Sequence, residues 1–152
     1  MDLKEAKLKA ASYCAYQERA PLEVKNKMSR LGLNPQQIEQ VIAFLMDENF
    51  LNPIRYAESF SRGKFRLKKW GRRKISFALK QKQIPSEIIE KALTEIKEDD
   101  YQTSIKKIIQ KKYKQLNREN SIETKHKIAR HLLQKGYESD LIWRWINILI
   151  KP

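Results

Sequence analysis

The sequence predicts an all-α fold, an elongated array of three tandem three-helix repeats with nine helices. Two observations carry this prediction. Apolar residues recur at helical spacing along the whole chain, and the strict alternation that marks a half-buried strand is almost absent. The same apolar pattern then returns after about 51 residues, which indicates a repeat protein.

Prolines, asparagines and glycines mark the expected helix ends. The first helix follows from apolar spacing alone. Pro21 and Pro35 suit the first positions of the second and third helices. Gly32 suits the end of the second helix, and Asn34 can cap the third. The first three helices are therefore expected near residues 2–18, 21–31 and 35–47.

The six later helices follow the same logic. Pro53 opens the fourth helix, and Asn52 before it can cap the free amide groups of the first turn. Ser86 starts the sixth helix, and Gly136 suits the end of the eighth. Apolar spacing predicts the others. The expected ranges are 53–66, 71–82, 86–98, 101–117, 121–135 and 138–150.

Eight apolar positions define one repeat. In the first repeat they are Val24, Met28, Leu31, Leu33, Ile38, Val41, Ile42 and Leu45. Adding 51 gives Ile75, Leu79, Lys82, Ile84, Ile89, Ala92, Leu93 and Ile96. Adding 104 gives Ile128, Leu132, Lys135, Tyr137, Ile142, Trp145, Ile146 and Leu149. Because such a unit leaves an apolar stripe for its neighbour to cover, we expect one domain over 1–152, with repeats 1–50, 51–100 and 101–152.

The charge of the chain is strongly basic and uneven. Lysine and arginine total 32 against 18 aspartate and glutamate, a net charge of +14. Residues 62–82 carry ten basic and no acidic side chains, and residues 105–135 carry ten basic and two acidic ones. The spacer 83–104 is acidic, and residues 1–61 carry no net charge. Two basic blocks predict an acidic partner that is met at selected points.

The composition excludes several classes of protein. The longest apolar run, 41–46, is too short to cross a membrane, and we expect no signal peptide. A single cysteine, Cys14, excludes an internal disulfide and fits the cytoplasm. No glycine-rich phosphate loop is present, and His126 and His131 are five residues apart, a spacing that does not aim two imidazoles at one metal. We expect no enzyme activity, no catalytic residue, no cofactor and no metal site.

The first basic block surrounds two aromatic rings, Phe65 and Trp70. Its cations can neutralise phosphates, whereas the rings either stack on bases or pack between repeats, and we favour packing. Ten cations without an acid repel one another, which favours a functional role for the charges. The candidate contacts with a filament or DNA are Arg62, Lys64, Arg66, Lys68, Lys69, Trp70, Arg72, Arg73 and Lys74.

The second block lies on the helix that leads the third repeat. Ile105, Ile108 and Ile109 form its apolar face, and lysines form the other face. That lysine face is either merely solvated or meets a phosphate or an acidic protein, and both interpretations stay open. The candidates are Lys106, Lys107, Lys111 and Lys112.

Two tryptophans near the end of the chain cannot share a helix face, because they are two residues apart. Trp145 aligns with core positions of the other repeats, whereas Trp143 aligns with Glu39 and Glu90 and is expected at the surface. Trp143 is then either covered by the chain's own end or anchors a partner.

Three segments resemble the RecX family of regulatory proteins. The stretches WGRRKI (70–75) and ALKQK (78–82) resemble the family's WGxxRI…EL…KG segment. The stretch FLNPIRYAESF (50–60) resembles YLDDxRYAxxF, and RAPLEVKNKM (19–28) resembles RSxxELxxKL. The resemblance covers residues 15–100 well and the last repeat more loosely.

Two positions depart from that family pattern. Pro53 stands where the family has an acidic residue, and it suits a helix start. Gln83 stands in place of the glycine of KG. A left-handed backbone at Gln83 would cost about 1 kcal/mol, because Gln lacks the conformational freedom of glycine.

The resemblance implies an array of three-helix units that lies in the groove of the RecA–DNA filament and touches more than one RecA protomer. It implies a modulator, usually an inhibitor, of RecA recombinase, ATPase and co-protease activity in DNA repair and the SOS response. We also expect a monomer that binds single- or double-stranded DNA weakly on its own and has no membrane partner.

Two alternatives stay open. The first is a stand-alone basic nucleic-acid-binding module of helix-turn-helix type, for which residues 28–41 have the general shape, although Gln36, Gln37 and Gln40 lack a dense basic flank. The second is a helical scaffold with no link to nucleic acid. A sharp preferred sequence in a binding-site selection would favour the first.

Overall fold

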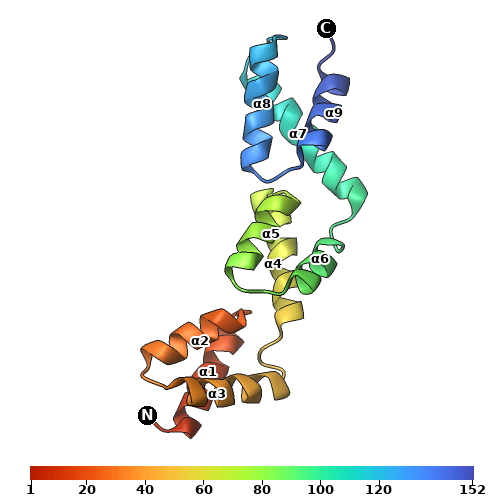
Figure 1. The fold of residues 1–152 in the computed structure, drawn as a ribbon. Coiled ribbons are helices and arrows are strands. Elements are labelled where there is room, and N and C mark those ends of the chain that lie inside the picture. Colours follow the sequence, from red (N-terminus) through yellow and green to blue (C-terminus); the bar gives the residue numbers. More distant parts are fainter. The chain divides into compact units, whose positions relative to one another are not determined.

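The computed structural model describes residues 1–152 as nine α-helices joined by short loops, with no strand (Figure 1). The all-α prediction and the number of helices are confirmed. The helices are α1 (Leu3–Tyr16), α2 (Pro21–Arg30), α3 (Pro35–Asp47), α4 (Pro53–Lys68), α5 (Arg72–Gln81), α6 (Ser86–Leu93), α7 (Glu98–Gln115), α8 (Ile122–Gln134) and α9 (Ser139–Leu149). None of them is long and apolar enough to cross a membrane.

The largest difference from the expected bounds lies between α6 and α7. We expected the sixth helix to reach residue 98, but α6 ends at Leu93 and α7 already begins at Glu98. Glu98, Asp99 and Asp100 occupy the first turn of α7, where carboxylates interact favourably with the positive end of the helix dipole. These three acids of the spacer therefore mark the start of α7.

The predicted caps are in place. Asn34 accepts a hydrogen bond from the amide of Gln37 at 2.8 Å, and the Gln37 side chain accepts from the amide of Asn34 at 2.9 Å. Asn52 accepts from the amide of Arg55 at 3.0 Å. The structure adds a cap that the sequence analysis did not single out, because Ser121 accepts from the amide of Thr124 at 3.1 Å.

The second helix of each repeat ends in the same way. Gly32, Gln83 and Gly136 occupy equivalent positions, and their φ angles are 92°, 59° and 97°. In each case the amide of the following residue donates to a carbonyl five residues earlier, at 3.1 to 3.2 Å. The backbone at Gln83 is therefore left-handed, the condition under which the missing glycine has a cost.

The chain forms two compact units. The first unit contains residues 1–59 and 79–92, and the second contains residues 60–78 and 93–152, so that α4 and α5 contribute to both. In the first unit, α1, α2 and α3 pack against one another (Figure 1). Their core consists of Ala6, Ala10, Cys14, Val24, Met28, Leu33, Val41, Leu45 and Leu51.

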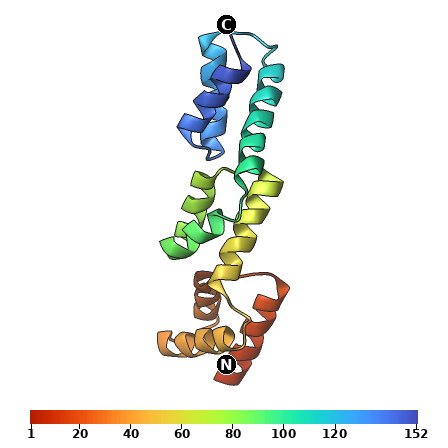
Figure 2. The ribbon, with the colours of Figure 1, turned by 90° about the vertical axis from the view of Figure 1, so that its right-hand side faces the viewer.

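In the second unit, α7 packs against α8 and α9, which also pack against each other (Figure 2). Its largest fully buried side chains are Tyr101, Tyr137, Ile75, Ile105, Ile109, Ile128 and Leu132. None of the eight repeat positions is exposed in any of the three copies, which confirms the core predicted from the repeat. Leu31, Lys82 and Lys135 are each half-buried at a helix end, as their shared position predicts.

Candidate functional site

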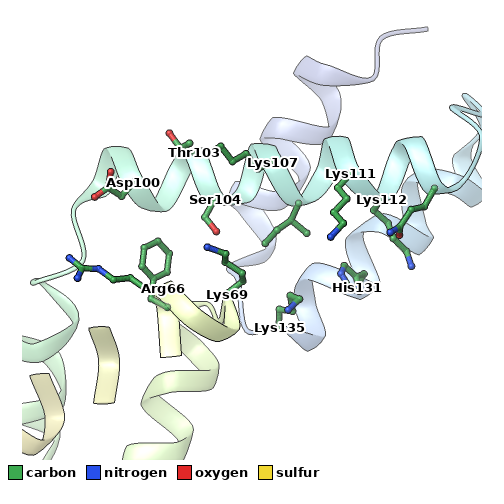
Figure 3. A pocket seen from close by; sticks show the side chains of 13 residues that line it. Arg66, Lys69, Asp100, Thr103, Ser104, Lys107, Lys111, Lys112, His131 and Lys135 are labelled. Atoms are coloured by element: carbon green, nitrogen blue, oxygen red, sulfur yellow. The ribbon is translucent and has the colours of Figure 1, made fainter. Parts of the chain in front are cut away.

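The second unit contains a groove lined mainly by basic side chains (Figure 3). We call it the basic groove. Its volume is about 610 Å³. It is lined by Phe65, Arg66, Lys69, Asp100, Thr103, Ser104, Lys107, Ile108, Lys111, Lys112, Gln115, His131 and Lys135. Six of these residues are lysine or arginine, against one carboxylate, so the groove suits a polyanion.

Helix α7 forms one side of the basic groove along most of its length. The lining positions from Asp100 to Gln115 recur three or four residues apart, as one face of a helix requires. Arg66 and Lys69, at the end of α4, and His131 and Lys135, at the end of α8, lie across from this face (Figure 3). Candidates from both basic blocks thus meet in one place.

The cations around His131 and Lys135 in the basic groove are crowded. Burial lowers the pKa of the Lys135 ammonium, and the charges of Lys74, Lys111 and Lys69 lower it further. Burial, followed by the charges of Lys112 and Lys135, lowers the pKa of His131. Each lowered pKa means that the charged form of the side chain is disfavoured in the free protein. A bound anion would relieve the repulsion among these cations.

A backbone contact joins the two segments that face α7 across the basic groove. The amide of Gly71 donates to the carbonyl of Lys135 at 2.7 Å, and the amide of Arg73 donates to the carbonyl of Gly136 at 2.9 Å. A side chain at Gly71 has no room, because its Cβ would lie 2.5 Å from the Tyr137 nitrogen. The loop after α4 is therefore fixed beside the end of α8.

Side chains add to this contact. The Lys135 ammonium donates to the carbonyl of Lys68 at 3.1 Å, and the Tyr137 hydroxyl donates to that of Lys69 at 3.0 Å. The Ser104 hydroxyl is 2.8 Å from the Tyr137 hydroxyl. Both Lys68 and Lys69 thus offer backbone carbonyls to the third repeat.

Arg72 is engaged within the protein. Its guanidinium lies 3.7 Å above the ring of Tyr101, pairs with Glu138 at 2.8 Å and also pairs with Glu98. The Tyr101 hydroxyl accepts from the Arg72 amide at 3.0 Å and donates to Glu138. Burial and Glu138 raise the pKa of Tyr101. Arg72 is thus the centre of an ion-pair cluster, and no free guanidinium is presented to a partner.

The aromatic rings of the first block pack within the protein, as favoured from the sequence. Phe65 stacks on Tyr101 with a centroid distance of 5.9 Å, and Trp70 meets Phe60 edge-on at 6.2 Å. The ammonium groups of Lys64 and Lys74 lie 4.9 and 4.6 Å from the centre of the Trp70 ring. These two lysines therefore cover a ring instead of lining the basic groove.

The remaining candidates also lie outside the basic groove. Arg62 lines a smaller cavity of about 110 Å³ together with Glu95 and Asp100. Lys68 and Arg73 are exposed. Lys106 lies over the ring of Trp145 at 4.1 Å, on the face of α7 that meets α9.

Two nitrogen-bearing side chains that can carry positive charge in the basic groove are absent from the sequence-based candidates, His131 and Lys135. Both lie on the last two turns of α8 or at its cap. The sequence contains a signal for Lys135, because it aligns with Leu31 and Lys82 at a helix end of the repeat. The structure shows that this position is half-buried in all three repeats. His131 has no such signal, since only the fold brings it beside Lys112.

The other aromatic and polar candidates are also placed by the structure. Trp143 is half-buried and meets His126 edge-on at 5.0 Å. No group of three or more His, Cys, Asp or Glu side chains is arranged to hold a metal ion. Cys14 is buried, and this burial raises the pKa of its thiol.

Models of two RecX domains match this chain. The model of the second three-helix domain of RecX matches residues 55–93, and the model of the third matches residues 98–146. The regulatory protein RecX of Clostridium perfringens is 35% identical over 120 residues, which are 78% of this chain and 56% of that protein. The RecX of Prosthecochloris aestuarii is 28% identical over 98% of this chain and 96% of its own length.

A solved structure has the same fold. The crystal structure of RecX from Lactobacillus salivarius matches with a TM-score of 0.89 and 26% identity, over 97% of this chain and 96% of that one. Against the clostridial proteins the chain spans only about half of the relative's length, 53 to 56%. The two domain models, the relatives and the common fold show that the chain belongs to the RecX family of regulatory proteins.

Proposed function

We propose that this chain modulates the RecA recombinase, as an inhibitor, by laying the basic groove against the phosphates of the RecA–DNA filament. The observation that carries the proposal is the meeting of both basic blocks in one groove of about 610 Å³. Membership of a family of regulatory proteins supports a role in control. The setting of this role is the cytoplasm, in DNA repair and the SOS response.

Electrostatics supports phosphates as the groove's ligand. The lowered pKa values of His131 and Lys135 arise from burial and from neighbouring lysines. A phosphodiester backbone supplies regularly spaced negative charges without sequence information, and the lysines recognise charge without a fixed hydrogen-bonding fork. The groove therefore suits binding to a filament on any DNA sequence.

The experiment is RecA-dependent ATP hydrolysis on single-stranded DNA, titrated with this protein. We expect wild-type protein to suppress hydrolysis. The double variant Lys111→Glu with Lys112→Glu should need at least about ten-fold more protein for the same effect, because it removes two groove charges and adds two repulsive ones.

The matched control carries the same change of net charge elsewhere. Lys25→Glu with Arg30→Glu alters two exposed residues of α2 that line neither the basic groove nor the other cavities. This variant should suppress hydrolysis like wild type. Equal suppression by the groove variant would contradict the role of the groove, and no suppression by any form at stoichiometric amounts would contradict the proposed function.

A further inference from the structure

A second groove lies on the first unit, along α1 and α2, and we call it the tyrosine groove. Its volume is about 520 Å³. It is lined by Leu8, Lys9, Ser12, Tyr13, Tyr16, Arg19, Lys27 and Leu31. Three cations and no carboxylate line it, although residues 1–61 carry no net charge. The charges of this segment are thus segregated in space.

Arg19 is held in a fixed orientation in the tyrosine groove. Its guanidinium lies 3.7 Å from the centre of the Tyr13 ring, and its Nε donates to the Tyr13 carbonyl at 2.9 Å. The Lys27 ammonium lies 4.9 Å from the same ring. Because these contacts use the ring stack and the Nε, the terminal nitrogens of Arg19 are left to form the fork that recognises a phosphate.

The acids nearest to Arg19 in the sequence are engaged elsewhere. Glu18 pairs with Arg55 at 2.5 Å. The Glu23 side chain accepts from the amide of Ala20 at 2.7 Å and lies 3.7 Å from the Lys82 ammonium. The positive charge of Arg19 is therefore available to a ligand.

Tyr16 places an uncovered aromatic ring beside this guanidinium. It is the last residue of α1, its relative exposure is 83%, and its ring centre is 5.8 Å from the Arg19 guanidinium. Packing does not account for an aromatic ring here, since so much of it is exposed, and the repeat does not require one, since Leu67 holds the equivalent position in α4. An exposed ring beside cations is the combination that binds single-stranded nucleic acid.

We propose that the tyrosine groove binds single-stranded nucleic acid, with a phosphate on Arg19 and an adjacent base stacked on Tyr16. Lys9 and Lys27 then neutralise the flanking phosphates. A duplex cannot use this site in full, because its bases are already paired and stacked. An acidic peptide could use the cations but would leave the Tyr16 ring without a planar partner. The contact needs no recombinase, so it does not rest on the proposed function.

The test measures binding of a short oligodeoxyadenylate that carries 2-aminopurine, whose fluorescence falls on stacking, and of a duplex of the same length. Tyr16→Ala should weaken single-strand binding at least about five-fold, equivalent to ~1 kcal/mol for one stacked base, and should remove the fluorescence change. Duplex binding should be unchanged, because the phosphate contacts remain.

Three further variants separate stacking from other effects. Tyr16→Phe should bind like wild type, since it keeps the ring, and Tyr16→Leu should bind like Tyr16→Ala, since it keeps only apolar contact. Leu67→Ala, the equivalent exposed position of the second repeat, should bind like wild type. Unchanged single-strand binding by Tyr16→Ala, or full binding by Tyr16→Leu, would overturn the proposal. An oligoglutamate peptide that displaces the strand and depends equally on Tyr16 would also overturn it, in favour of a protein partner.

Discussion

Gly71 and Gly136 meet backbone to backbone in the second unit, and neither position has room for a side chain. The amide of Gly71 donates to the carbonyl of Lys135 at 2.7 Å. A Cβ on Gly71 would lie 2.5 Å from the nitrogen of Tyr137, and one on Gly136 would lie 2.5 Å from that of Lys74. Because this contact joins the end of α4 to the end of α8, it also places the cations of the basic groove opposite α7.

Alanine at either glycine should destabilise the protein. Gly71→Ala should lower the free energy of unfolding by about 1–3 kcal/mol, the usual cost of overpacking. Gly136→Ala should cost about 1–2 kcal/mol more, because its φ of 97° is unfavourable for any side chain. Urea denaturation measures both effects.

Two other glycines serve as controls. Gly63→Ala, inside α4 with open space around it, should raise the free energy of unfolding by up to about 1 kcal/mol, since alanine is the better helix former. Gly32→Ala has the left-handed φ of 92° without any steric contact, so it isolates the backbone cost. A similar change in all four variants would contradict the close backbone contact.

Gln83 is the one repeat end that lacks glycine at the left-handed position. Gln83→Gly should raise the free energy of unfolding by about 0.5–1 kcal/mol, because glycine adopts this conformation without steric cost. The reverse change, Gly32→Gln, should lower it by a similar amount. Thermal or urea unfolding of the two variants measures both changes. A Gln83→Gly variant that is no more stable than wild type would count against the left-handed backbone at this position.

Arg72 should contribute more to stability than its exposed neighbour. Arg72→Ala leaves Glu138 and Glu98 without their cationic partner and uncovers the Tyr101 ring, so we expect a loss of about 1–3 kcal/mol in the free energy of unfolding. Arg73→Ala should change it by less than about 0.5 kcal/mol. Equal effects would show that the cluster around Arg72 adds nothing. A charge reversal at Arg72 therefore tests the stability of the fold, whereas substitutions of lysines in the basic groove test binding.

His131 should make anion binding by the basic groove dependent on pH. The free protein has a lowered His131 pKa, because burial and the charges of Lys112 and Lys135 disfavour the imidazolium. An anion among Lys111, Lys112 and Lys135 favours the imidazolium and raises that pKa. Affinity for inorganic triphosphate should then increase as the pH falls through the region around the ordinary histidine pKa of about 6.5.

His131→Ala should bind triphosphate with a smaller pH dependence over that range. Titration calorimetry at several pH values makes the comparison. An affinity of the wild type that stays constant across the range would contradict the proton linkage.

Much of the fold could be predicted because the local signals agree with one another. Pro21, Pro35 and Pro53 each begin a helix, and the repeat positions are buried or half-buried, as the aligned apolar residues predict. Aligned with Gly32 and Gly136, Gln83 has the same left-handed backbone. These features depend on residues close in the sequence or on a regular repeat.

The candidate site could be predicted only in part, because the fold selects among the cations. Lys106 and Lys107 are adjacent, yet Lys106 covers Trp145 and Lys107 lines the basic groove, since successive helix positions face different directions. The Arg72 guanidinium forms ion pairs with two glutamates, 26 and 66 residues later in the sequence, and is therefore engaged within the protein. His131 enters the groove through packing between helices, which no local pattern records.

The most direct test of the central claim is the salt dependence of binding to RecA filaments on single-stranded DNA. Each phosphate neutralised contributes about −0.7 to the slope of log affinity against log salt on a single strand. Lys111→Gln with Lys112→Gln should therefore weaken binding and make the slope shallower by about 1.4, if each lysine contacts one phosphate. The control Lys25→Gln with Arg30→Gln should match wild type. An affinity and slope of the groove variant equal to those of wild type would contradict the account.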